Sequence, residues 1–210
     1  MQITERQIEI DSNWFSAERD VQRSKGLHLS HVIDFIESKT YDEDKTVMHR
    51  YAVAGFWWER LLEKFINLNV WDRWDWLFSR VMVEVDNPVV IRPGEMCIDG
   101  IFLTPDGYNI ETEQLEEYKY TSKSSKGGIY DNPKFRRWLQ YQIPAYLHAL
   151  NLTVCCLRVY FSRGDYTDGK PIWMEYVIEY SEQEIAEIWE MILLNAEAMR
   201  KAGLVDNERT

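Results

Sequence analysis

Apolar positions recur with a helical period in the first part of the chain. In residues 51–66 they return every three or four positions, which predicts an amphipathic helix. Shorter helices are predicted at residues 31–38, where Ser30 can cap the first turn, and at the tryptophan-rich stretch 72–79. Residues 1–80 are therefore expected to be mainly helical.

The period then changes to that of strands. Short runs rich in β-branched and aromatic residues, bounded by turn residues, predict strands at residues 81–85, 96–103 and 114–120. Pro105-Asp106-Gly107 lies between the last two runs and predicts a hairpin turn. We expect these three strands to form a meander.

Helix and strand patterns alternate in the last part of the chain. Pro133 opens a predicted helix that runs to residue 150. Strands are predicted at residues 153–161 and 171–180, and the capping box Ser181-Glu-Gln-Glu184 begins a helix that ends near residue 202. This order predicts a mixed α/β fold, with helices around a central β-sheet.

Length and composition favour one globular domain. The 210 residues are 45% hydrophobic and 28% charged, ordinary values for a soluble protein. No repeat or linker divides them, so we expect a mainly helical part at 1–80, the sheet with the helix at 133–150 at 81–180, a C-terminal helix at 181–202 and a tail at 203–210. Without a signal-peptide pattern or an apolar run of membrane-spanning length, the expected location is the cytoplasm (the host cytoplasm if the chain is phage-encoded), with no membrane partner.

The charge is unevenly distributed. The net charge is −11, but residues 119–163 hold eight basic side chains and one acidic one, Asp131. Residues 1–118 and 164–210 carry net charges of −11 and −7. A basic middle in an acidic frame suits a polyanion that touches one face, and it equally suits a solvated basic surface.

Three charged residues of the predicted strands could form a metal site. Glu117 and Lys119 are two residues apart and so project to the same side of a strand. If the strand containing Asp99 pairs with theirs, Asp99 and Glu117 can bind one Mg²⁺ or Mn²⁺, with Lys119 beside it to position a water or stabilise negative charge. The same residues also suit a simple ion pair across a solvated sheet face.

The helix at 133–150 offers a second polar pair. Gln142 and Tyr146 are four residues apart and share one helical face, with Arg136 and Arg137 preceding them. Such a glutamine can hold the DNA backbone or a water molecule. It can also be an ordinary surface residue.

These motifs, in this order, resemble the PD-(D/E)XK nuclease superfamily. The elements are Ile98-Asp99-Gly100, Glu117-Tyr118-Lys119 and Gln142-x-x-x-Tyr146, the last typical of its RecB-like and YqaJ-like (phage-type) exonuclease branch. Gly55-Phe-Trp-Trp-Glu59 and Val83-Glu84 resemble further elements, so the resemblance covers about residues 50 to 150. One departure is Ile98, which stands where the superfamily name places a proline.

The resemblance implies a restriction-endonuclease-like fold and a role for each motif residue. Asp99 and Glu117 would be metal ligands together with the backbone carbonyl of Tyr118, and Glu59 would be a further acid near the metals. Lys119 would be the catalytic lysine, and Gln142 and Tyr146 would organise the site. The CRISPR-associated relatives bind an iron–sulfur cluster with four cysteines. No such cluster is expected here, because the chain has only Cys97, Cys155 and Cys156.

The implied function is a Mg²⁺- or Mn²⁺-dependent DNase, an exonuclease of DNA recombination, repair or phage DNA processing that acts on double- or single-stranded ends. Lys123, Lys126, Arg136 and Arg137 are the candidate phosphate contacts. The acidic periphery suggests that DNA is enclosed by a homo-oligomer or delivered by a recombination partner protein. The alternatives are a catalytically silent nuclease-like module that binds nucleic acid or protein, a structure-specific endonuclease, and an enzyme that acts on RNA.

Overall fold

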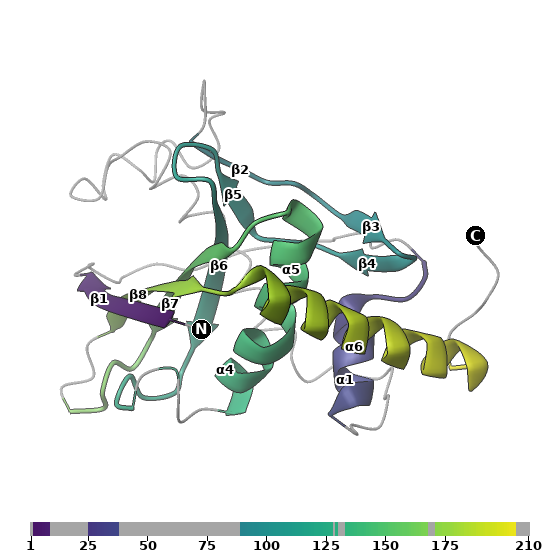
Figure 1. Ribbon diagram of the computed structural model, residues 1–210. Coiled ribbons are helices and arrows are strands. Elements are labelled where there is room, and N and C mark those ends of the chain that lie inside the picture. The colour runs from purple at the N-terminus through teal and green to yellow at the C-terminus, as the bar shows by residue number, and fades with distance from the viewer. Residues whose placement is uncertain are drawn as a thin grey trace.

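The computed structural model of the chain (Figure 1) describes residues 2–8, 25–37, 89–127, 129, 133–167 and 171–204. The elements predicted at 51–66, 72–79 and 81–85, and with them Glu59, lie outside the described residues.

A six-stranded mixed sheet forms the centre of the molecule, with strand order β1-β8-β7-β6-β5-β2. Its strands are β1 (Gln2–Ile8), β2 (Val90–Ile91), β5 (Gly107–Asn109), β6 (Gln114–Thr121), β7 (Val154–Phe161) and β8 (Ile172–Glu179). β6 and β7 are parallel, and every other neighbouring pair is antiparallel. The strands predicted at 114–120, 153–161 and 171–180 are thereby confirmed.

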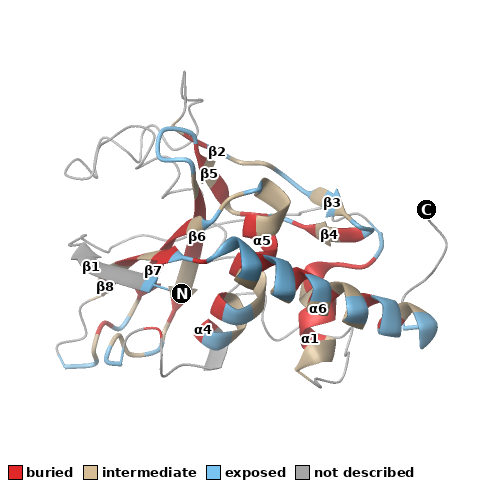
Figure 2. Cartoon of the chain, in the orientation of Figure 1, coloured by how far each residue is buried: buried red, intermediate tan, exposed pale blue. Residues whose placement is uncertain are grey.

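Helices cover one face of this sheet (Figure 1). They are α1 (Leu29–Ile36), α4 (Pro133–Arg137), the π-helical turn η2 (Trp138–Gln142), α5 (Ile143–Leu150) and α6 (Glu182–Lys201). Leu115 of β6 and Leu157 of β7 are fully buried in the core between sheet and helices, where Leu147 of α5 packs with them. Figure 2 shows this buried layer where α5 meets the strands. The predicted mixed α/β class is confirmed.

The ends of α6 follow the sequence closely. Ser181 accepts from the backbone N–H of Glu184, and the Glu184 carboxylate accepts from the backbone N–H of Ser181, which is the predicted capping box. At the other end Gly203 has a φ of +67°, and the N–H of Leu204 donates to the carbonyl of Met199. This left-handed glycine ends the helix, because it redirects the chain at little steric cost.

Residues 96–103 do not form one strand, and the predicted meander is wrong. Asp99 and Gly100 both have positive φ, 52° and 74°, and form the two-residue turn of a hairpin. β3 (Met96–Ile98) and β4 (Ile101–Leu103) pair with each other in a separate two-stranded sheet, and Phe102 of β4 also forms a single parallel bridge with His28. An Asp-Gly pair between two apolar runs is a strong signal for such a turn.

The hairpin turn next along the chain is also displaced from its predicted place. Asn109 pairs with Gln114, so the turn lies at residues 110–113 and not at 105–107. The Asn109 side chain accepts from the backbone N–H groups of Glu111 and Thr112, which stabilises the turn. Asp106 therefore lies immediately before strand β5.

The described residues of the N-terminal part include a strand that was not predicted. β1 is a strand that pairs with β8, although the paired residues lie far apart in sequence, from Gln2 with Glu179 to Ile8 with Trp173. Helix α1 begins at Leu29, two residues before the predicted start, and its N-cap is His28 rather than Ser30. Within the described residues, no helix is both long enough and apolar enough to span a membrane.

Candidate functional site

Strand β6 places Glu117 and Lys119 on the sheet face that the helices cover. The two side chains share this face with Leu115, since residues two apart on a strand point the same way. β6 lies between β5 and β7, so its backbone is paired on both sides. Glu117 is fully buried, and the Lys119 side chain is 12% exposed. The two predicted residues are thus on a rigid central strand, with only the lysine end near solvent.

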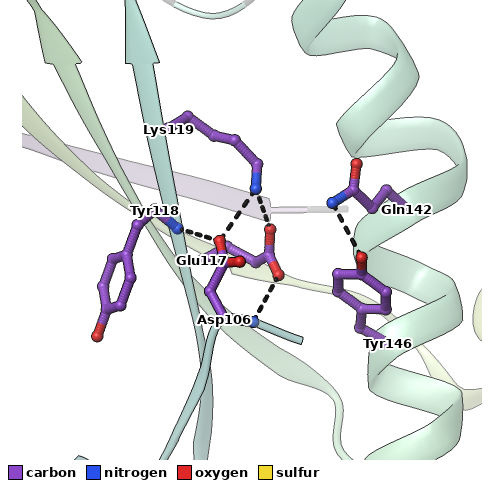
Figure 3. A network of polar contacts seen from close by, with 6 residues as sticks. All are labelled: Asp106, Glu117, Tyr118, Lys119, Gln142 and Tyr146. Atoms are coloured by element: carbon purple, nitrogen blue, oxygen red, sulfur yellow. Dashed lines mark hydrogen bonds and ion pairs between the residues drawn. The ribbon is translucent and has the colours of Figure 1, made fainter. Parts of the chain in front are cut away.

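The second carboxylate of the site belongs to Asp106 (Figure 3). Gly107 pairs with Glu116, so Asp106, immediately before β5, lies opposite Glu117 of β6. Asp106 Oδ2 accepts from the backbone N–H of Tyr118 at 2.9 Å, and the backbone N–H of Asp106 donates to Glu117 Oε1 over a long 3.4 Å. These reciprocal bonds hold the two acids at fixed positions beside each other.

One ammonium group joins both acids. Lys119 Nζ lies 2.5 Å from Glu117 Oε2 and 3.1 Å from Asp106 Oδ2. The same nitrogen lies 5.5 Å from the centre of the Trp138 ring, within the range of a cation–π contact. The two carboxylates are therefore close enough to share one cation.

The surroundings of Glu117 disfavour the charged form of its carboxyl group. Burial is the main cause that raises the pKa of Glu117 to about 8, the negative charge of Asp106 adds to it, and Lys119 opposes both. A buried pair of like charges is costly unless a cation neutralises it. Lys119 fills this role in the structure.

Gln142 and Tyr146 lie across from these charges (Figure 3). Gln142 Nε2 donates to Tyr146 Oη at 3.2 Å. Burial, and next to it the charge of Glu117, raise the pKa of Tyr146. The structure therefore brings Glu117, Lys119, Gln142 and Tyr146 together.

The helix that carries this pair is irregular at Gln142. The N–H of Ile143 donates to the carbonyl of Trp138, five residues earlier, which defines the π-helical turn. Pro144 has no N–H, so the carbonyl of Leu139 lacks a helical donor. Tyr180 Oη donates to that carbonyl at 2.6 Å and completes its bonding. Such π turns are common at functional sites.

Asp99 is not part of this constellation, contrary to our prediction. It occupies the β3–β4 turn, where its Oδ2 accepts from Trp189 Nε1 of α6 at 3.0 Å. Arg200 donates to the backbone carbonyls of Asp99 and Gly100. No hydrogen bond or ion pair between described residues joins Asp99 to Glu117. Its contacts fasten the small sheet to α6.

The basic candidates divide into two groups. Arg137 is taken up structurally, because its guanidinium contacts Asp34, Glu37 and the carbonyl of Ser30. This corrects the prediction that Arg137 contacts phosphate. Arg136, Lys123 and Lys126 are exposed, and Lys126 Nζ lies 3.5 Å from Asp165.

Asp106 is a residue of the site that was not predicted from the sequence. Its position could have been found by counting from the turn, because a four-residue turn at 110–113 places residue 106 opposite residue 117. Among the described side chains, no group of three or more His, Cys, Asp or Glu residues could hold a metal ion. The candidate donor set is therefore two carboxylates, with backbone carbonyl or water oxygens beside them.

Comparison of the chain with family models, with curated proteins and with solved structures found no match.

Proposed function

We propose that this chain is a divalent-metal-dependent DNA nuclease of the PD-(D/E)XK type, an exonuclease. The single observation that carries the proposal is the contact of Lys119 Nζ with both Asp106 and Glu117, beside the Gln142–Tyr146 pair. Two carboxylates held around one cationic point, with a polar pair opposite, are the parts that phosphodiester hydrolysis needs.

The resemblance to that superfamily becomes stronger when Asp106, and not Asp99, is taken as the first acid of the motif. Asp106 follows Pro105, so the chain carries Pro105-Asp106 and then Glu117-Tyr118-Lys119. The proline that the superfamily name calls for is thus present at the reassigned position. A mixed sheet whose parallel pair β6–β7 carries the motif, with helices on the motif's face, supports a restriction-endonuclease-like fold.

The donor set fits Mg²⁺ or Mn²⁺. These ions prefer oxygen ligands and are commonly bound by one or two carboxylates while keeping several waters. Asp106 and Glu117 would hold the ion together with the backbone carbonyl of Tyr118. When bound, such an ion neutralises charge on the phosphate and promotes ionisation of the attacking water.

The other residues act directly on substrate or water. Lys119 carries three donors on a flexible stem and can donate to a phosphate oxygen where negative charge develops. The carboxamide of Gln142 can orient a water or a backbone oxygen of DNA, and Tyr146 fixes that carboxamide through its hydroxyl. Burial of Glu117 excludes bulk water from one side of the site.

Replacement of either acid tests the proposal. Asp106→Asn and Glu117→Gln should each lower the rate of linear DNA hydrolysis in Mg²⁺ or Mn²⁺ by at least about 100-fold. Asp99→Asn is the matched control, and it should leave the rate nearly unchanged, because Asp99 lies outside the site. Circular dichroism checks that each variant is folded. Wild-type rates in both site variants would contradict the proposal.

The choice of an exonuclease is tested separately. Closed circular DNA should survive incubation with the enzyme while linear DNA of the same sequence is degraded. Degradation of both forms at equal rates would instead favour an endonuclease with the same site.

A further inference from the structure

Two loops leave the sheet together at the end of the strand that carries Glu117 and Lys119. Because β6 and β7 are parallel, the segments that follow them, residues 122–127 and 162–167, emerge at the same edge. The backbone N–H of Ser125 donates to the carbonyl of Gly164 at 2.8 Å, and that of Ser162 donates to Thr121 at 2.9 Å. We call these two segments the loop pair.

An aromatic ring is held outward on the loop pair. Tyr166 is 53% exposed. Its φ of +68° lies in the left-handed region, which is disfavoured for a residue with a Cβ. Its hydroxyl donates to the carbonyl of Ser122 on the other loop at 2.6 Å. The ring is therefore anchored at its polar end, while about half of the residue remains exposed to solvent.

Basic side chains adjoin this ring in the chain. Lys123 follows Ser122, and the Tyr166 N–H donates to the carbonyl of Arg163. Both Lys123 and Arg163 are exposed, and neither side chain makes an ion pair within the described part of the chain. Lys126 instead links the loops, through Asp165 at 3.5 Å and Thr167 at 3.2 Å. The surface thus combines a fixed aromatic ring with two available positive charges, on a chain whose net charge is −11.

The loop pair lies close to the candidate site. Ser122 follows Lys119 by three residues along an extended chain, a distance of about 10 Å. A strand of nucleic acid that contacts Lys119 can therefore reach the loop pair.

We propose that the loop pair binds single-stranded DNA, with the Tyr166 ring stacked on an unpaired base and Lys123 and Arg163 contacting phosphates. Sequence-tolerant binding of single strands commonly combines these two kinds of contact. The proposal rests on the proposed nuclease function for its choice of DNA, and it deepens that function by assigning the substrate at the site as an unpaired strand. A duplex hides its base faces and cannot use the ring in this way.

Binding without hydrolysis tests this proposal. The full chain is titrated in EDTA against a fluorescein-labelled oligothymidylate and against a duplex of equal length, with fluorescence anisotropy as the readout. Tyr166→Asn should weaken oligothymidylate binding about 10- to 100-fold and leave duplex binding nearly unchanged. Asparagine tolerates positive φ, so this variant adds no backbone strain at residue 166, and Tyr166→Phe controls for the lost hydroxyl bond to Ser122. The matched control Tyr166→Phe retains the ring and should retain most of the affinity.

The charges have their own signature. Lys123→Gln and Arg163→Gln should each weaken oligothymidylate binding and reduce its dependence on salt concentration. Wild-type affinity in Tyr166→Asn would overturn the stacking role, and unchanged salt dependence in both charge variants would overturn the phosphate contacts.

The outcomes separate this inference from the proposed function. If binding of oligothymidylate depends on the Tyr166 ring but the chain does not hydrolyse DNA, the role of the loop pair stands and the nuclease function is rejected. If the chain hydrolyses DNA in a metal-dependent way but binds oligothymidylate equally well without the Tyr166 ring, the nuclease function stands and the role of the loop pair is rejected.

Discussion

The two faces of strand β6 carry similar charges and differ in what those charges can do. Glu117 points toward the helices, and its neighbour Glu116 points to the opposite face. Each is buried, and each is joined by a second acid and one basic residue. On the helix face these are Asp106 and Lys119, and on the opposite face they are Glu175 and Arg158.

The geometry of the cation separates the two clusters. Arg158 binds Glu116 through two nitrogens, at 2.9 and 3.2 Å, and Glu175 through a third at 2.7 Å. A guanidinium in this forked arrangement is fixed in one orientation. Lys119 contacts its two acids through one nitrogen on a flexible stem, next to the polar Gln142–Tyr146 pair. We infer that the Arg158 cluster stabilises the sheet, whereas the Lys119 cluster can exchange partners.

The largest expected effect comes from breaking the Arg158 cluster. Arg158→Met should lower the free energy of unfolding by about 3–5 kcal/mol, because it leaves Glu116 and Glu175 buried without a cation. Urea denaturation measures this loss. Lys201→Met is the matched control, since Lys201 pairs with Glu197 on the surface and such pairs contribute about 0–1 kcal/mol. Equal losses in the two variants would show that the buried cluster does not stabilise the fold.

A second effect on stability is expected from pH at Glu117. Its pKa rises from 4.5 to about 8 on folding, so the folded protein holds this proton more tightly than the unfolded chain. Metal-free protein should therefore lose stability as pH rises between these two values. Glu117→Gln removes this contribution, and its melting temperature should fall less over the same range. Parallel melting profiles for the two proteins would contradict the raised pKa.

Metal should reverse that loss at the upper end of the range. Mg²⁺ added at pH 8 should raise the melting temperature of the wild-type protein, because an ion that binds only the folded state stabilises it. Glu117→Gln should show no such rise. A wild-type protein that does not respond to Mg²⁺ or Mn²⁺ would favour the catalytically silent module.

The smallest expected effects concern two tyrosines. Tyr118 lies on the face of β6 that points away from the helices, and Tyr146 belongs to helix α5 on the other side. Tyr118 Oη is buried and has no hydrogen-bond partner among the described residues, so Tyr118→Phe should change the free energy of unfolding by less than about 1 kcal/mol. Tyr146→Phe should cost about 1 kcal/mol and also slow DNA hydrolysis, because Gln142 loses its acceptor. Thermal denaturation and a hydrolysis assay measure both. A larger stability loss in Tyr118→Phe than in Tyr146→Phe would contradict this contrast.

Locally determined features were the ones that the sequence could predict. Strand β6, with Glu117 and Lys119, follows from its composition, and the helix α6 follows from its capping box. The two Asp-Gly pairs could not be told apart in this way. Asp99-Gly100 forms a turn and Asp106-Gly107 leads into a strand, although both pairs lie beside apolar runs. The difference depends on which strands pair, and pairing is set by the whole sheet.

Contacts between residues far apart in the chain could likewise not be predicted from the sequence pattern. Arg137 is bound by Asp34 and Glu37, about a hundred residues away, so its charge is not available to a ligand. Arg158 belongs to the basic segment by sequence, but it lies buried between two acids. A count of charges along the chain therefore overstates the basic surface of the folded protein.

Tyr180 connects three parts of the molecule: the helix that carries Gln142, the start of β7 and the N-terminus of α6. Its hydroxyl completes the helix next to Gln142, its backbone N–H donates to Thr153 before β7, and it immediately precedes the cap of α6. The helical turn that carries Gln142 is thus stabilised by a residue at the end of β8. A disturbance of that strand end would reach the Gln142 carboxamide without touching any residue that surrounds it.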